Sequence, residues 1–182
     1  MNNALGLVEF LKVPTGMLIS DKMAKSANIE IIHAATVCPG KYIVLFKGTI
    51  SEVNTALDVA KFESEENIID SFLLGNPVED IYKAITGCNE IIENSSIGIV
   101  ESYSVASIIE AADIAAKSAK LNLVEVRLAR GMCGKSFFIV SGDISAVEMG
   151  VKTSKRILKE KGMLLDDAII NSPDKGFIEN LY

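Results

Sequence analysis

The sequence contains no tryptophan, only one histidine, and three cysteines that lie far apart along its 182 residues. A single histidine leaves little material for a catalytic triad or a zinc centre. An odd number of distant cysteines is also a poor basis for structural disulfides, so we expect a reducing, intracellular setting. These absences disfavour histidine-based enzymes and disulfide-rich secreted domains.

Long apolar runs and clusters of basic residues are lacking as well. No apolar run approaches the ~20 residues needed to cross a bilayer. The opening residues, MNNALGLVEF, lack the charged start and cleavage site of a secretory signal. With 18 basic and 24 acidic residues the formal net charge is −6, and we find no Lys/Arg cluster suited to phosphates. We therefore predict a soluble cytoplasmic protein that binds neither nucleic acid nor membrane.

The composition does provide a core. Hydrophobic residues make up 49% of the chain, aromatic residues only 6%, and there are four prolines. Such a chain can fill small, closely packed layers with aliphatic side chains and alanine. Its length suits one ordinary domain or two small ones.

The chain repeats itself after about ninety residues. Four motifs recur in the same order: ALGLVEFL and SIGIVESY (4–11, 96–103), DKMAKSANI and DIAAKSAKL (21–29, 113–121), Gly-Lys (40–41, 134–135), and GTISEV and GDISAV (48–53, 142–147). Conserved order over the whole repeat indicates a duplication. We place the two domains at 1–88 and 95–182, joined by a linker over 85–96 that includes Cys88.

Each copy has the same pattern of predicted elements. In the first copy we expect strands at 4–11, 29–37, 41–46 and 67–74, and helices at 14–27, 49–66 and 76–85. In the second copy we expect strands near 97–102, 121–129, 135–141 and 163–170, and helices near 104–119 and 143–161. The order β-α-β-β-α-β plus a short helix predicts an α+β fold of two tandem ferredoxin-like units.

The stretch ATVCPGK places Cys38 in a Pro-Gly turn of the predicted first hairpin. No second cysteine is close enough in sequence to clamp a metal with it. One chain cannot build a cysteine site from this turn, whereas several copies meeting at an axis could. The simpler alternative is a small buried hydrophobic residue.

Three features together point to a known family: the GLVE and GIVE openings (6–9, 98–101), AKSA in both first helices (24–27, 116–119), and CPGK (38–41). The chain resembles the tandem-domain shell proteins of bacterial microcompartments, in particular the iron–sulfur subgroup of the propanediol-utilisation type. The resemblance implies a homotrimeric, pseudo-hexameric tile that packs edge to edge with other shell proteins in the coat.

The resemblance also implies a central pore and a metal centre. Cys38 from each of three chains would bind one [4Fe–4S] cluster, leaving one iron to a non-cysteine ligand. Expected pore-lining residues are Pro39, Gly40, Lys41, Met132, Cys133, Gly134 and Lys135. Cys133 departs from the small, glycine-rich residues usual in that subgroup; it is either a further ligand or a small residue beside the pore. The implied role is electron transfer across the shell, or cluster delivery to an enclosed redox enzyme.

Two interpretations are open for each of four lysines. The resemblance places Lys25 and Lys117 at the tile edge, where they would contact a neighbouring tile; the alternative is an ordinary exposed helix lysine. Lys41 and Lys135 are either solvated or placed to favour anions and a negatively charged cluster.

Several other candidate sites carry less weight. RGMCGKS fails as a phosphate loop, because Ala129 stands where a glycine is needed and a strand follows. His33 matches Glu125 of the other copy and is expected on a polar strand face. The acids that recur, Glu9 with Glu101 and Asp21 with Asp113, suggest one structural role used twice.

Two other functions remain open. The first is a tandem binding module that gates a small molecule at the pore without a metal cluster. The second is an enzyme with Cys38 as nucleophile, which we disfavour because no plausible base accompanies the thiol. We expect a non-enzymatic protein.

Overall fold

A computed structural model describes residues 3–87, 89–91 and 95–181. Residues up to Pro77, together with Ala129–Gly134, form one compact unit, and the remainder of the chain forms a second. Within the described ranges, no helix combines the length and the apolar character needed to cross a bilayer.

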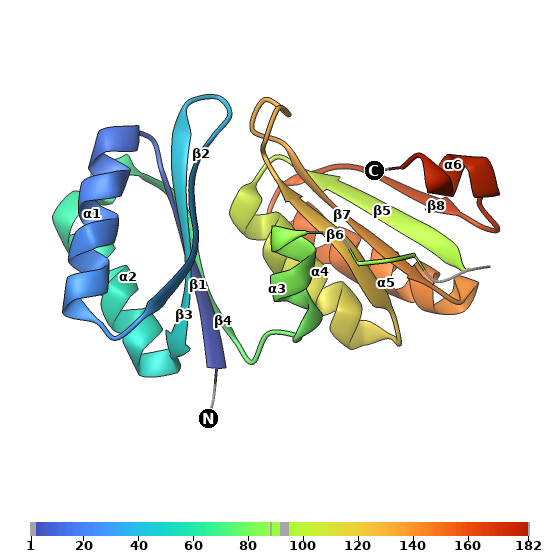
Figure 1. Ribbon diagram of the computed structural model, residues 1–182, viewed down its shortest axis with the longest axis horizontal. Coiled ribbons are helices and arrows are strands. Elements are labelled where there is room, and N and C mark those ends of the chain that lie inside the picture. Colours follow the sequence, from blue (N-terminus) through green and yellow to red (C-terminus); the bar gives the residue numbers. More distant parts are fainter. Residues whose placement is uncertain (1–2, 88, 92–94, 182) are drawn as a thin grey trace. The chain divides into compact units, whose positions relative to one another are not determined.

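The first unit is a four-stranded antiparallel sheet with two helices on one of its faces (Figure 1). Its elements are β1 (Asn3–Phe10), α1 (Val13–Ser26), β2 (Glu30–Val37), β3 (Lys41–Thr49), α2 (Ile50–Ser64), a 3₁₀ turn (Glu65–Asn67) and β4 (Ile68–Gly75). The strand order is β2-β3-β1-β4. This is the predicted ferredoxin-like arrangement.

The second unit repeats this plan. Its elements are α3 (Asp80–Thr86), β5 (Ser96–Ser102), α4 (Val105–Ser118), β6 (Asn122–Leu128), β7 (Ser136–Gly142), α5 (Ile144–Glu160), β8 (Leu164–Ile170) and α6 (Lys175–Glu179). The strand order is β6-β7-β5-β8, and α4 and α5 pack on each other and on the sheet. The predicted strand and helix order is confirmed in both copies.

Two local details differ from the sequence expectation. Strand β3 extends to Thr49, beyond the predicted 41–46. Thr49 is also the N-cap of α2: its side chain accepts the Glu52 N–H, and the Glu52 carboxylate accepts the Thr49 N–H. The short helix α3, which follows the first copy in sequence, packs against β6 and α4 of the second unit.

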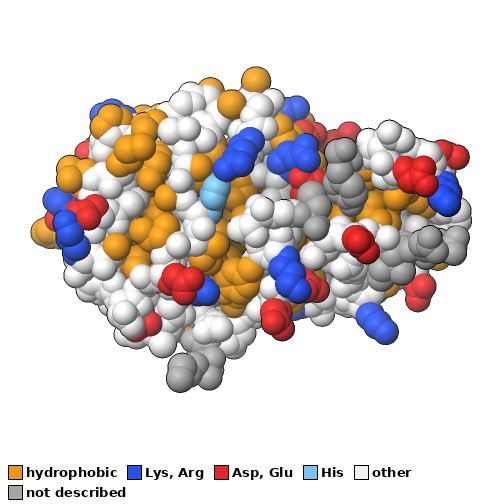
Figure 2. Space-filling view, viewed as in Figure 1, with side chains coloured by type: hydrophobic (Ala, Val, Ile, Leu, Met, Phe, Trp, Pro, Cys, Tyr) orange, Lys and Arg blue, Asp and Glu red, His pale blue; other side chains and the backbone are white. Residues whose placement is uncertain are grey.

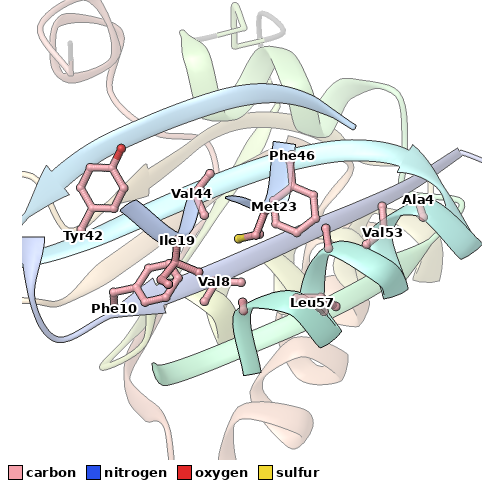
Figure 3. Packing of buried hydrophobic residues seen from close by; sticks show 12 residues of the cluster. Ala4, Val8, Phe10, Ile19, Met23, Tyr42, Val44, Phe46, Val53 and Leu57 are labelled. Carbon is pink, nitrogen blue, oxygen red and sulfur yellow. The ribbon is translucent and has the colours of Figure 1, made fainter. Parts of the chain in front are cut away.

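The core of the first unit lies between its sheet and its helices (Figure 3). Side chains from β1, β3, α1 and α2 meet there, and the largest completely buried ones are Phe10, Met23 and Phe46. Burying each such side chain contributes about 1.5–3 kcal/mol to the free energy of unfolding. The central strands β1 and β3 supply the sheet side of this core and are buried along most of their length.

The glycine of the recurring GLVE/GIVE motif is explained by this packing. A Cβ on Gly6 would lie 2.6 Å from the ring of Phe46 and 2.8 Å from Val53 on α2. A Cβ on Gly98 would lie 2.6 Å from Val151 and 2.8 Å from Val147 on α5. In both copies the second helix crosses the central strand too closely for any side chain.

We expect Gly98→Ala to lower the free energy of unfolding by about 1–3 kcal/mol, because the added methyl group overlaps two valine side chains. The matched control is Gly75→Ala in β4, where the nearest atom would be 3.9 Å away and the change should stay within about 0.5 kcal/mol. Urea unfolding of both variants measures the difference. Equal stability of the two would contradict the close approach.

Candidate functional site

The first hairpin turn joins β2 to β3 through Cys38, Pro39 and Gly40. The Gly40 N–H donates to the Val37 carbonyl oxygen, with 2.9 Å between the atoms, and Gly40 has a φ of 93°, which suits glycine. The Cys38–Pro39 peptide bond is cis. The predicted tight turn is confirmed, and Cys38 lies inside it.

The Cys38 thiol is free and partly buried. Its backbone N–H donates to the Ala129 carbonyl oxygen within the first compact unit, at 3.2 Å. Among the described residues there is no group of three or more His, Cys, Asp or Glu side chains that could hold a metal ion. Among the described residues, Cys38 is therefore not part of a metal-binding group formed within one chain.

The second hairpin turn has an unusual backbone. Positive φ angles occur at Ala129 (49°), Gly131 (69°), Cys133 (52°) and Gly134 (88°). A non-glycine residue in this region costs roughly 1–2 kcal/mol, so Cys133 stands where glycine would be favoured. Its thiol is free and exposed. Cys88, which we expect to be structural, lies outside the described residues.

The hairpin lysines are paired with glutamates in both copies. Lys41 Nζ lies 2.9 Å from Glu9 Oε1, and Lys135 Nζ lies 3.3 Å from Glu101 Oε1. The Glu9 side chain is 2% exposed, so Lys41 is paired with a nearly completely buried carboxyl group. The expected repeated role of the two glutamates is confirmed: each neutralises the lysine at the base of its hairpin. Neither lysine is a purely solvated cation.

The aspartates of the first helices, Asp21 and Asp113, each form an ion pair with the lysine four residues later. Lys25 Nζ lies 2.5 Å from Asp21 Oδ2, and Lys117 Nζ lies 2.5 Å from Asp113 Oδ2. The settings differ: the Asp21 side chain is 56% exposed, whereas that of Asp113 is 1% exposed and also accepts the Val78 N–H at 2.7 Å. The tile-edge role of the two lysines stays a prediction.

His33 is a half-buried residue of β2. Its Nε2 lies 3.3 Å from a guanidinium nitrogen of Arg130, and Figure 2 shows the histidine beside a basic side chain. Burial, and secondarily the Arg130 charge, lower the pKa of His33 below its usual value. The equivalent Glu125 of β6 pairs with Arg127 at 2.6 Å. Both positions hold polar side chains, as expected.

One surface feature escaped the sequence analysis. A groove along α5 is lined by Met149, Lys152, Thr153, Lys155, Arg156, Lys159 and Glu160. The expectation that the chain has no basic cluster is therefore wrong for this helix. The signal was in the sequence, because cations spaced three and four residues apart share one helix face.

The comparisons with known proteins now identify the family. The sequence profile described as "BMC domain" matches residues 4–77 and 96–173. The chain belongs to the BMC-domain family. It is 35% identical to the bacterial microcompartment shell protein PduT of Citrobacter freundii, over 95% of this chain and 94% of that protein. It is 22% identical to the carboxysome assembly protein CcmO of Synechocystis, over 86% of this chain and 58% of that one.

Solved structures of BMC-domain proteins agree. A microcompartment protein of Desulfitobacterium hafniense superposes with a TM-score of 0.91 at 35% identity, covering 98% of this chain and 99% of that one. A fused, permuted hexameric shell protein of the RMM microcompartment gives a TM-score of 0.67 at 15% identity, covering 87% and 84%, which shows a shared fold. The chain is therefore a structural shell protein of the PduT type and not an enzyme, and its place is the microcompartment shell.

The duplicated Asp–Lys pairs give a matched stability test. Asp113→Ala should lower the free energy of unfolding by about 2–4 kcal/mol, because it leaves the part-buried Val78 N–H unpaired and removes the partner of Lys117. Asp21→Ala, the same change at an exposed pair, should stay within about 0.5 kcal/mol. Denaturant unfolding of both proteins measures the contrast. Similar losses in the two variants would show that burial is not the cause.

The lowered pKa of His33 predicts a pH effect with a definite sign. Above the unfolded-state pKa of about 6.5 the residue is neutral in both states and has no effect. As the pH falls below that value, the unfolded chain binds the proton first, so stability decreases. The loss of stability between pH 7.5 and pH 5.5 should be smaller in His33→Gln than in the wild type. Parallel pH profiles from thermal unfolding would contradict the shift.

Proposed function

We propose that three copies of the chain form a pseudo-hexameric shell tile, and that Cys38 from each copy binds one [4Fe–4S] cluster at the shared axis. The observation that carries the proposal is the position of Cys38: a free thiol in a hydrogen-bonded hairpin turn, which belongs to no group of three metal donors among the described residues. Membership of the BMC-domain family supports an assembly of several copies, and we propose that the turns converge at its axis.

The donor chemistry fits an iron–sulfur cluster. Thiolates are the ligands that these clusters use, normally four of them. A three-fold ring supplies three equivalent thiolates from one residue per chain. The fourth iron then takes a water molecule or another non-cysteine ligand, which leaves the cluster more accessible and more labile than a four-cysteine one.

The residues around Cys38 have defined tasks in this proposal. The Gly40 N–H to Val37 hydrogen bond limits the movement of the thiol. Because Lys41 is paired with the buried Glu9, it adds little net positive charge beside the cluster. Cys133 is exposed in the other hairpin turn and is not required as a ligand.

The proposed role is electron transfer across the shell, or delivery of the cluster to an enclosed redox enzyme. When bound, the cluster would supply one-electron redox chemistry. The tile would pack edge to edge with other shell proteins. A cluster on the axis would also obstruct the pore, so we do not assign metabolite conduction to it.

Anaerobic purification tests the metal site. The wild type should show broad visible absorbance and contain about four iron and four sulfide ions per three chains. Cys38→Ser should lose the colour and most of the iron, whereas Cys133→Ser, a matched removal of the other hairpin thiol, should keep both. Light scattering should give a trimer for all three proteins.

Other outcomes would each remove part of the proposal. A colourless wild-type trimer, even after anaerobic treatment with iron and sulfide, would favour the pore-gating module without a cluster. Loss of iron in Cys133→Ser would make the ligand set larger than Cys38 alone. A monomeric protein would remove the shared axis altogether.

A further inference from the structure

The helices α2 and α5 occupy the same place in the two repeats. Their buried positions correspond one to one: Val53, Ala56, Leu57, Ala60 and Ser64 in α2, and Val147, Gly150, Val151, Ser154 and Leu158 in α5. Since the inward positions match, the outward positions also correspond. Asp58 is equivalent to Lys152, Phe62 to Arg156, and Glu65 to Lys159.

The outward faces carry opposite charge at these equivalent positions. Residues 50–67 contain five acids and one base, whereas residues 144–160 contain two acids and four bases. Positions 152 and 159 are seven residues apart and so lie on one side of α5. Asp58 lies on α2, and Glu65 is the first residue of the 3₁₀ turn that directly follows that helix. We call Asp58, Phe62 and Glu65 the acidic face, and Lys152, Arg156 and Lys159 the basic face.

The charged side chains of the two faces have no ion-pair partner among the described residues. Asp58, Glu65, Lys152, Arg156 and Lys159 are exposed, and none of their side chains has a hydrogen bond or ion pair to another described residue. Neighbouring charges on the same helices are engaged: Glu63 pairs with Lys22, and Lys155 pairs with Asp167, both at 2.6 Å. The two faces therefore carry unpaired charge of opposite sign.

Each face also offers apolar surface. Phe62 is 91% exposed, beside a groove of about 480 Å³ between α1 and α2 that Asp58 also lines. Met149 is 49% exposed and lines the α5 groove of about 550 Å³ together with the basic face. An aromatic ring so fully exposed is costly in water and suits an interface.

We propose that the acidic face of one copy docks on the basic face of a second copy, joining neighbouring tiles. An approximate two-fold axis between equivalent helices makes them antiparallel, which sets Asp58 opposite Lys159 and Glu65 opposite Lys152. Phe62 then lies near Arg156, where a guanidinium can stack on the ring. The occupant is a second copy because the charges, the spacing and the aromatic partner all match within this one sequence.

The charge pattern also selects which domains meet. Two acidic faces, or two basic faces, would oppose like charges at both positions and repel each other. Only a first domain against a second domain is attractive, so each contact is heterotypic although the domains share one fold. This inference rests on membership of the shell family and is independent of the metal proposal, because it uses no residue of either hairpin.

Charge reversal tests the pairing. Variant A is Asp58→Lys/Glu65→Lys, which makes both faces basic; variant B is Lys152→Glu/Lys159→Glu, which makes both acidic. We expect each variant alone to need at least about tenfold more protein than the wild type to assemble beyond its basic oligomer at low salt. An equimolar mixture of A and B should assemble like the wild type, as should the variant that carries all four changes. Light scattering and electron microscopy measure the assembly.

The controls separate docking from folding and from overall charge. Glu79→Lys/Glu179→Lys makes the same charge change as variant A on exposed residues outside both faces and should assemble normally. Recovery in the mixture excludes misfolding of A and B. Normal assembly of A or B alone, no recovery in the mixture, or a wild type without salt-sensitive association would each overturn the proposal.

Discussion

The structure depends on one steric constraint, the passage of a helix directly over a central strand. Gly6 and Gly98 allow α2 and α5 to approach β1 and β5 so closely that no side chain fits between them. Every inward position of the two helices is fixed by that approach, which is why their buried residues correspond throughout. The outward positions are under no such constraint, and the two copies differ there in the sign of their charge.

Duplication has therefore produced two units with the same interior and different surfaces. The Glu9–Lys41 and Glu101–Lys135 pairs serve the same local purpose in the two hairpins. The hairpin turns themselves differ: Cys38 precedes a proline in a turn with one positive φ angle, and Cys133 belongs to a turn with four. A six-fold ring of identical domains could not distinguish alternate positions, whereas two unlike domains in one chain can assign different tasks to alternate places.

The sequence was sufficient for the element order and the sheet topology, because the apolar periodicity and the repeated motifs are local signals. It also indicated that the recurring acids are structural, since the same residue twice implies the same contact twice. It did not show that α3 packs on the second unit or that Asp113 accepts the Val78 N–H, because both depend on contacts distant in sequence. The basic face of α5 was missed for another reason: the net charge of −6 concealed a local cluster.

The contrast between Asp21 and Asp113 has a consequence for how the two halves evolve. Both descend from one ancestral residue, yet the first is open to solvent and the second is enclosed and holds a backbone amide. Selection can accept many replacements at the first and very few at the second. Residues at equivalent places in the two halves of a duplicated chain can therefore tolerate substitution to different extents, according to the contacts that each one makes.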